Sequence, residues 1–174
     1  MQKDKKFSAF VEYCKQLATE HMLIRHSDTE KHFFRYELEE ILTGLQNANY
    51  PAFILEGYRF GFKDARSDNP IKKRSGAFVL MAHVADPGDY NQIHEVWDKM
   101  EAIGDDIFAR LKQDKREITS PVYDFDLASV EGSLIATELG SHYGIRFTFD
   151  IDCQMDMDVD PTHWYVEPVE EPVV

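Results

Sequence analysis

An unbroken alternation of apolar and polar residues runs from His142 to Asp160 and constrains the fold more than any other stretch of the chain. Its apolar positions are Tyr143, Ile145, Phe147, Phe149, Ile151, Cys153, Met155, Met157 and Val159. Because successive side chains of a strand point to opposite faces of a sheet, this period of two predicts one long strand with one packed face and one wet face. The chain must therefore form a sheet with a core on one side.

The other elements follow from apolar spacing and from turn residues. Apolar residues three to four positions apart predict helices, and alternation between turn-rich segments predicts strands. Asp89, followed by Gln92, is typical of a helix start with a capping box. The segment 32–45 fits both periods, and we interpret it as a strand followed by a short helix. The predicted helices span 6–24 and 89–116, and the other predicted strands span 52–63, 72–85, 123–138 and 142–160.

These elements predict a single α+β domain over residues 1–160. The strands 52–63 and 72–85 form one long hairpin around the turn residues 64–70, and 123–138 and 142–160 form a second hairpin. The simplest packing is one antiparallel sheet with the N-terminal helix and the long central helix on one face. Residues 161–174 contain three prolines and three glutamates and predict an extended acidic tail.

Charge is unevenly distributed along the chain, whose formal net charge is −13. Every Lys and Arg lies at or before Arg146, whereas the segment from Asp150 onward carries eight acidic residues. An acidic protein repels nucleic-acid phosphates, so we expect no nucleic-acid partner. No apolar run reaches membrane-spanning length and the first residues do not resemble a signal peptide, which predicts a cytoplasmic protein without a membrane partner.

The acidic series near the C-terminus is the first candidate metal site. Asp156, Asp158, Asp160 and Glu167 match positions 1, 3, 5 and 12 of a calcium-binding loop. However, Pro161 stands where the sharp turn of that loop needs glycine, and no helices flank the segment. We therefore interpret the aspartates as the solvated face of the long strand.

A second candidate lies on the long helix, where His94, Glu95 and Asp98 form an H-E-x-x-D pattern. Two ligands four residues apart share a helix face, as in zinc hydrolases, but no third ligand is identifiable. A small metal-dependent hydrolase that uses these residues or the terminal aspartates is one alternative function. The histidines at 21, 26 and 32 are loosely spaced near the end of the first predicted helix and match no metal-ligand spacing. We interpret them as surface or turn residues.

Nucleophiles and phosphate-binding loops give no catalytic candidate. Ser120, Ser133 and Ser141 lie outside any G-x-S-x-G elbow. Cys14 and Cys153 fall on apolar faces, which predicts buried, protonated and reduced thiols. The glycines at 57 and 61 lie inside a strand and precede no helix, unlike those of a nucleotide-binding loop. We therefore predict no catalytic, cofactor-binding or metal-binding residues and no cofactor.

The charged surfaces suggest self-association. The tip of the first hairpin is basic, through Arg59, Lys63, Arg66, Lys72, Lys73 and Arg74, and the segment 150–171 is acidic. In two copies of the protein these surfaces could meet head to tail and close into a ring. Alternatively, both are solvated ends of strands, or the acidic face is a binding module for a basic protein partner.

Several segments together resemble small prophage proteins. They are "YPAFILEGYRFGF", "DNPIKKRSGAFVLMAHV", the capped helix "DYNQIHEVWDKMEAIGDDIFARL" and "GSHYGIRFTFDIDCQMD". Their order resembles that of phage tail terminator and tail completion proteins, over roughly residues 5 to 158. The resemblance implies a non-enzymatic virion assembly protein that forms a homo-oligomeric ring, caps the tail tube and faces the head–tail connector. Its location would be the host cytoplasm or the virion.

Overall fold

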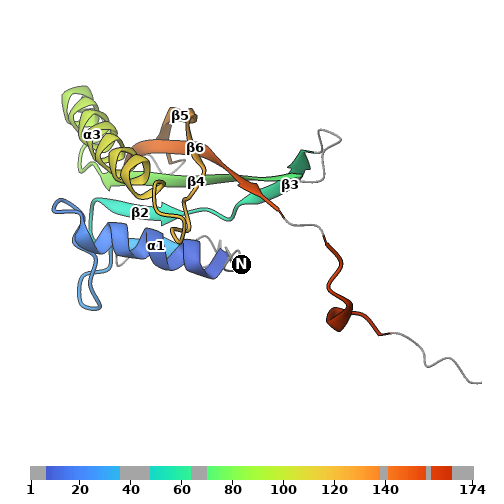
Figure 1. Cartoon of the computed structure of the whole chain (residues 1–174). Coiled ribbons are helices and arrows are strands. Elements are labelled where there is room, and N and C mark those ends of the chain that lie inside the picture. Colours follow the sequence, from blue (N-terminus) through green and yellow to red (C-terminus); the bar gives the residue numbers. More distant parts are fainter. Residues whose placement is uncertain (1–6, 36–47, 64–69, 138–140, 156–157, 166–174) are drawn as a thin grey trace, which may run out of the picture.

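The computed structural model describes residues 7–35, 48–63, 70–137, 141–155 and 158–165. These residues form an α+β fold in which helices cover one face of a mixed, mostly antiparallel sheet (Figure 1). The helices are α1 (Phe7–Glu20) and α3 (Tyr90–Asp114). The strands are β1 (Phe33–Arg35), β2 (Ala52–Leu55), β3 (Arg59–Lys63), β4 (Ile71–His83), β5 (Phe125–Ala136) and β6 (His142–Gln154), followed by the 3-10 turn η2 (Pro161–His163).

The sheet is built around β4 and β6. The order of strands is β1-β2-β4-β6-β5, and β3 pairs with the first part of β4. The two central strands are antiparallel and paired along their whole length, from Ile71 opposite Gln154 to His83 opposite His142. The two predicted long hairpins are therefore present, side by side in one sheet. The fold class predicted from the sequence is confirmed.

The alternation that begins at His142 is confirmed only as far as Gln154. From Ile145 to Cys153 every second residue is buried, as a strand with one packed face requires. Gln154 lies opposite Ile71, the first residue of β4, and the amide of Met155 donates to the carbonyl of Pro70, just before that strand. Asp158, Val159 and Asp160 are exposed and belong to no strand. The predicted strand end at Asp160 is wrong because alternation cannot maintain a strand without a partner.

The predicted strand 52–63 is interrupted. Residues 56–58 separate β2 from β3, and the register against β4 shifts by one residue across the gap, because Ala52 faces Met81 whereas Arg59 faces Ser75. At the sheet's edge β1 runs parallel to β2, so the sheet is mixed there. The segment 32–45 was interpreted as a strand followed by a short helix, and its residues from 36 onward lie outside the described residues. So do residues 64–69 of the predicted hairpin turn.

The other elements differ from prediction mainly at their ends. The helix predicted over 6–24 ends at Glu20, and the chain leaves it through a turn in which Arg25 has a φ of 54°. Asp89 caps α3 as predicted, because its side chain accepts bonds from the amides of Asn91 and Gln92. The strand predicted over 123–138 begins at Phe125, ends at Ala136 and contains a register irregularity between Asp126 and Glu131.

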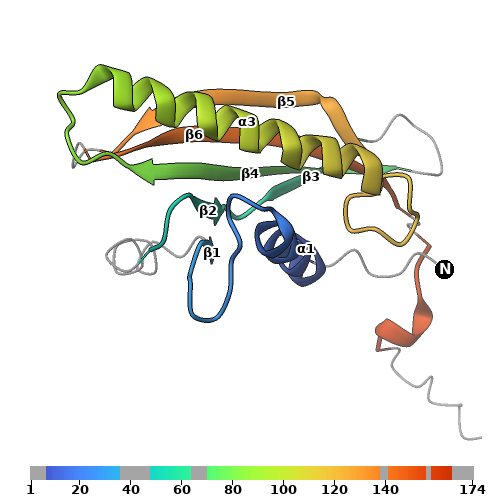
Figure 2. The same cartoon turned by 90° about the vertical axis from the view of Figure 1, so that its left-hand side faces the viewer.

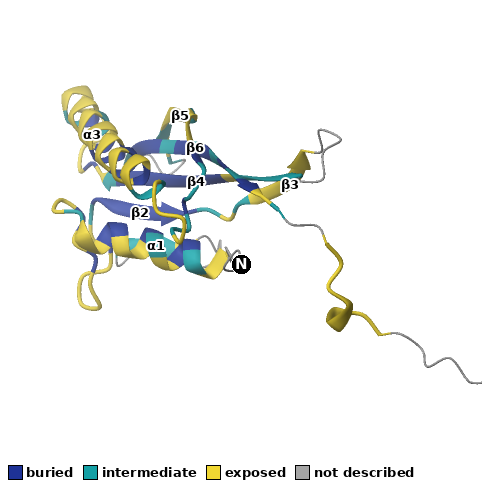
Figure 3. Cartoon of the chain, in the orientation of Figure 1, coloured by how far each residue is buried: buried dark blue, intermediate teal, exposed yellow. Residues whose placement is uncertain are grey.

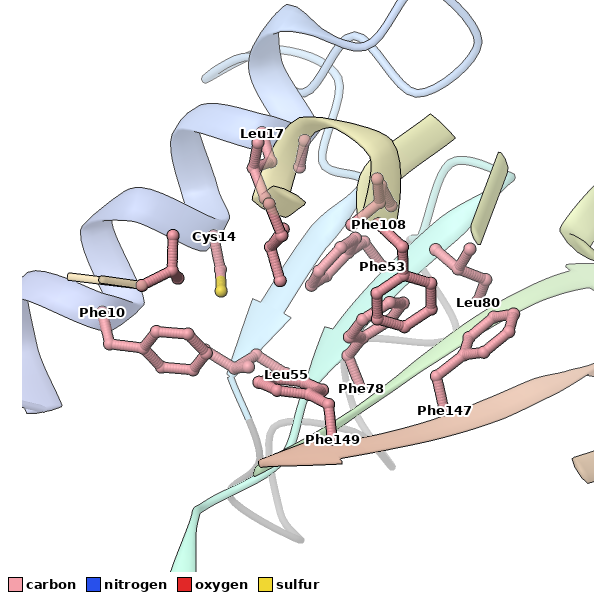
Figure 4. Close-up of a cluster of buried hydrophobic side chains, with 14 of the residues drawn as sticks. Phe10, Cys14, Leu17, Phe53, Leu55, Phe78, Leu80, Phe108, Phe147 and Phe149 are labelled. Atoms are coloured by element: carbon pink, nitrogen blue, oxygen red, sulfur yellow. The ribbon is translucent and has the colours of Figure 1, made fainter. Parts of the chain in front are cut away.

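Both helices pack on the same face of the sheet, which we call the helix-side face (Figure 2). The core there is aromatic, with ring centroids 4.8 Å apart for Phe53 and Phe78, and 5.2 Å apart for Phe78 and Phe147 (Figure 4). Phe108 of α3 packs edge-on against Phe147. The opposite face, the open face, carries a smaller buried cluster of Ala52, Ile54, Val79 and Met81.

Gly104 lets α3 approach the sheet closely, and its replacement provides a test of this packing. A Cβ at Gly104 would overlap the ring of Phe147, which other aromatic rings hold in place. Although alanine is the better helix former, Gly104→Ala is expected to lower the free energy of unfolding by about 1–3 kcal/mol, the usual cost of overpacking a core. Urea denaturation measures this effect.

The matched control is Asp105→Ala, because Asp105 is the next residue of α3 and is exposed. Its free energy of unfolding should stay within about 0.5 kcal/mol of the wild-type value. Equal stability of the Gly104→Ala and Asp105→Ala proteins would contradict the close approach of α3 to Phe147.

Candidate functional site

Opposite charges meet on the open face of the central strands. Lys73 Nζ lies 2.6 Å from Asp150 Oδ2, and Lys63 Nζ lies 3.0 Å from Asp152 Oδ2. The hydroxyl of Ser75 also donates to Asp150, at 2.6 Å. Burial opposes the charge of Asp150, but the bonds from Lys73 and Ser75 outweigh it and hold the pKa of this carboxyl below its usual value.

A further ion pair lies on the same face. Arg146 of β6 donates two hydrogen bonds, 2.8 Å and 2.7 Å long, to the two carboxylate oxygens of Glu56. Glu56 follows β2, so this bidentate pair links the sheet's two halves across β4. Part of the basic hairpin tip and part of the acidic segment therefore bind each other within one chain. Lys63, Lys73, Asp150 and Asp152 therefore have their opposite charges within the chain.

The helix-side face of the first hairpin presents an aromatic and cationic surface. Phe60 and Phe62 of β3 are 61% and 51% exposed, although both are large and apolar. Lys72 Nζ lies 4.4 Å from the ring centroid of Phe60 and 5.7 Å from that of Phe62. We call Phe60, Phe62 and Lys72 the hairpin patch. Figure 3 shows β3 as an exposed strand that extends beyond the helices.

Asp160 of the acidic C-terminal series has a local structural role. It caps η2, because its Oδ1 accepts from the amide and the hydroxyl of Thr162. These bonds lower the pKa of Asp160. Asp156 and Glu167 lie outside the described residues. Within the described part of the chain, no group of three or more His, Cys, Asp or Glu residues is placed to hold a metal ion.

The H-E-x-x-D residues are also placed without a third ligand among the described residues. His94 stacks on Trp97 with centroids 5.9 Å apart, and both Glu95 and Asp98 lie on the surface of α3. His21 lies 3.4 Å from Asp106 of α3. The described residues therefore supply no set of metal ligands for the alternative function of a metal-dependent hydrolase.

Histidines that are far apart in the sequence gather near the segment Tyr50–Pro51. His26 and His32 are buried, contrary to the surface or turn positions predicted for them. His26 Nδ1 accepts from the amides of His32 and Phe33, and His32 Nδ1 donates to the carbonyl of Pro51 at 2.8 Å. Because His26 Nδ1 is an acceptor, this contact requires a neutral ring.

We call His26, His32, Tyr50, His83 and His142 the histidine corner, and the part made by Tyr50, His83 and His142 was not identified from the sequence. His142 Nε2 lies 2.6 Å from the hydroxyl of Tyr50, and the rings of His83 and His142 are 5.2 Å apart. Burial, and then the nearby His83, lower the pKa of His142, while burial raises that of Tyr50. No local sequence pattern joins positions 50, 83 and 142. Only the pairing of His83 with His142 in the β4–β6 ladder brings them together.

The candidate nucleophiles have structural partners. Ser120 accepts from the amide of Val122, and Ser133 lies 3.5 Å from the carbonyl of Arg146. Ser141 lies 3.1 Å from Nδ1 of His142, but the other nitrogen of that ring meets Tyr50 rather than a carboxylate. Cys14 and Cys153 are buried and unlinked as predicted, and burial raises the pKa of Cys14 well above its usual value.

The outermost strand β5 is a long and largely exposed sheet edge. The amide of Thr137 donates to the carbonyl of His142, which makes these two residues a hydrogen-bonded pair. Hydrogen-bonded and non-hydrogen-bonded pairs alternate along an antiparallel ladder. By that alternation, the backbone groups of Gly132, Leu134 and Ala136 point away from β6. The amide of Glu56 donates to the carbonyl of Ala77, so the backbone groups of Ala77 and of every second residue of β4 point toward β2 and β3. In the register of β3 these residues lie opposite Arg59, Gly61 and Lys63, and the backbone groups of Phe60 and Phe62 therefore point outward.

Comparisons with known proteins identify no relative: no protein-family model matches the chain, and no curated protein matches it. Among the described residues, no helix is both long enough and apolar enough to cross a membrane. The surfaces described above are therefore the basis for a functional proposal.

The histidine corner predicts a loss of stability in acid. Burial, followed by Lys15 and His32, lowers the pKa of His26 in spite of the opposing Asp28. A lowered folded-state pKa means that the stabilisation is complete above the unfolded value of about 6.5 and is lost as the pH falls below it. Between pH 7.5 and pH 5, about one unit or more on each side of 6.5, the urea midpoint should fall.

The variant His26→Asn keeps an acceptor near the position of Nδ1 but cannot gain a proton. Its urea midpoint should fall less than that of the wild-type protein over the same pH interval. A fall of the same size in both proteins would show that other groups cause the acid sensitivity.

Proposed function

We propose that the protein is a non-enzymatic assembly protein that works as a homo-oligomer through its exposed strand edges. The observation that carries this proposal is the β5 edge. From Leu127 to Ala136 this strand has one charged residue, Glu131, and most of its residues are exposed. Long and nearly uncharged edges pair readily with other strands, and soluble monomers usually block them.

Part of the β5 edge is closed within the chain. In the irregular stretch after Asp126, Asp126 accepts from the amide of Ala128, and the hydroxyl of Ser129 donates to the carbonyl of Asp126. Ser129 also accepts from the amide of Asp150. Such bulges discourage pairing locally. Among the described residues no such block lies on the regular part, from Glu131 to Ala136, which includes the exposed Leu134. This is the stretch that we assign to contacts between copies.

The resemblance to tail terminator and tail completion proteins specifies the proposal further. The order of helix, strand, hairpin, long helix and hairpin supports it, because the same order underlies the resemblance. Under this proposal the copies form a ring at the end of a phage or prophage tail. Its partners are the tail tube and the head–tail connector, and its location is the host cytoplasm or the virion.

Net charge shapes how such an assembly forms. Copies with a formal charge of −13 repel each other, and salt screens this repulsion over a Debye length of about 8 Å at 0.15 M ionic strength. Strand pairing at the β5 edge is short-range and involves few charges. We therefore expect the contact through the β5 edge to strengthen when salt is added.

The variant Leu134→Pro tests the β5 edge. Proline removes the outward amide of Leu134 and leaves the bonds of β5 to β6 in place, because those bonds involve residues 133, 135 and 137. The mean mass of the purified protein, measured by light scattering over a range of concentrations at low and high salt, should fall relative to wild type. The weakening should be about tenfold or more in the dissociation constant.

The matched control is Leu134→Ala, which removes the exposed side chain but keeps the amide. It should retain most of the association, because backbone hydrogen bonds dominate the pairing of strand edges. A wild-type protein that is monomeric at every concentration and salt level would contradict the proposal. Equal association of the Leu134→Pro and wild-type proteins would exclude the β5 edge as the contact.

A further inference from the structure

A short segment after β6 extends away from the body of the protein, as Figure 1 shows. We call residues 158–165 the arm. Its hydrophobic side chains are highly exposed, with Val159 at 72%, Trp164 at 66% and Tyr165 at 87%. Exposing two large aromatic residues next to each other is unfavourable in water, because each can bury about 150–250 Å². Aromatic residues are also enriched where proteins contact partners.

The arm has its own local structure. Pro161 begins the turn η2, Asp160 caps it, and the amides of His163 and Trp164 bond back to the carbonyls of Asp160 and Pro161. These bonds all stay within the segment. They fix part of the backbone before any contact is made, which reduces the ordering cost of binding. The carboxylates of Asp158 and Asp160 are exposed beside the aromatic residues.

The hairpin patch is complementary to the arm in composition and charge. It combines the exposed rings of Phe60 and Phe62 with the ammonium group of Lys72. The outward backbone groups of Phe60 and Phe62 can also accept an added strand. The described residues place no strand against this edge of β3. The arm offers aromatic rings and carboxylates, and the patch offers aromatic rings and a cation.

We infer that the arm of one copy docks on the hairpin patch of a second copy. Trp164 and Tyr165 then cover Phe60 and Phe62, and the arm's carboxylates lie near Lys72. The arm of each copy points away from its own β3, so its own patch stays open to a neighbour (Figure 1). A contact between two different surfaces is heterologous, and it closes into a ring when the rotation allows.

This inference rests on the proposed homo-oligomer and identifies one of its contacts. It also modifies the opposite-charge argument made from the sequence. Lys63, Lys73, Asp150 and Asp152 pair within the chain. The charges assigned to the contact between copies are that of Lys72 in the hairpin patch and those of the carboxylates of the arm.

Cross-linking between two tagged chains tests the contact directly. One full-length chain carries Phe62→Cys and the other carries Tyr165→Cys, so Phe60 and Trp164 remain to make the contact. A short bismaleimide should join the two chains into a covalent heterodimer. Both natural cysteines are buried, which limits background reaction. The control replaces Phe62→Cys by Leu23→Cys, because Leu23 is 52% exposed and lies in the turn after α1. The heterodimer should form about tenfold faster than in the control, as a specific contact of moderate strength predicts.

Three results would overturn the inference. Cross-linking no faster than in the Leu23→Cys control means that the arm and the patch do not meet. A chain with both Phe62→Cys and Tyr165→Cys that yields only internally linked monomer means that the arm docks on its own chain. Unchanged cross-linking when Lys72→Glu or Trp164→Ala is added means that the proposed side chains do not make the contact.

Failure of this contact is distinguishable from failure of the homo-oligomer. If light scattering finds wild-type assemblies but the cross-link is absent, the strand-edge proposal stands and the arm contact falls. If wild type is monomeric throughout, both fall. Circular dichroism of each variant confirms folding, which we expect because every substituted position is at least partly exposed.

Discussion

The antiparallel pairing of β4 with β6 is the interaction on which the rest of the structure depends. Its helix-side face carries Phe78, Phe147 and Phe149, against which both helices pack. Its open face carries the ion pair of Lys73 with Asp150. The close approach of the two strands relies on Gly144, where a Cβ would strike the carbonyl of Leu80. The aromatic core, the pairing of Lys73 with Asp150 and the meeting of His83 with His142 all depend on this register.

Much of this arrangement could be predicted from local sequence patterns. The alternation after His142 identified the packed residues of β6, and the cap at Asp89 located the start of α3. Patterns of this kind report which face of an element is buried, because burial depends on the period of the backbone. They do not report where a partner strand ends, which explains why β6 stops at Gln154 rather than Asp160. Similarly, the parallel pairing of β1 with β2 depends on how a short segment docks.

Features made from distant residues could not be predicted. The pairing of Lys73 with Asp150 requires the β4–β6 register, and the meeting of Tyr50 with His142 requires two adjoining elements. The sequence marked Phe60 and Phe62 as apolar positions of a strand, but it did not show that the hairpin extends past the helices and leaves them exposed. Exposure depends on what covers a residue, and that information is not local.

The surfaces left over by the folded chain are the basis of the functional account. On the open face, Lys63 and Lys73 pair with Asp152 and Asp150 of the same chain, although the sequence had suggested these charges for contacts between copies. What remains is a nearly uncharged strand edge, an aromatic and cationic hairpin patch, and an arm with exposed aromatic residues. All three suit contacts between protein chains better than chemistry on a small substrate. They fit an assembly protein whose copies join edge to edge and through exchanged arms.

Amide hydrogen exchange of the wild-type protein at increasing concentration tests this account most directly. The account predicts that the outward amides of Gly132, Leu134 and Ala136 exchange more slowly as the concentration rises. The amides within the β4–β6 ladder should be protected at every concentration, because they are already bonded in the monomer. Rapid exchange of the three outward amides at all concentrations, with no slowing, would contradict the claim that copies of this chain associate through the β5 edge.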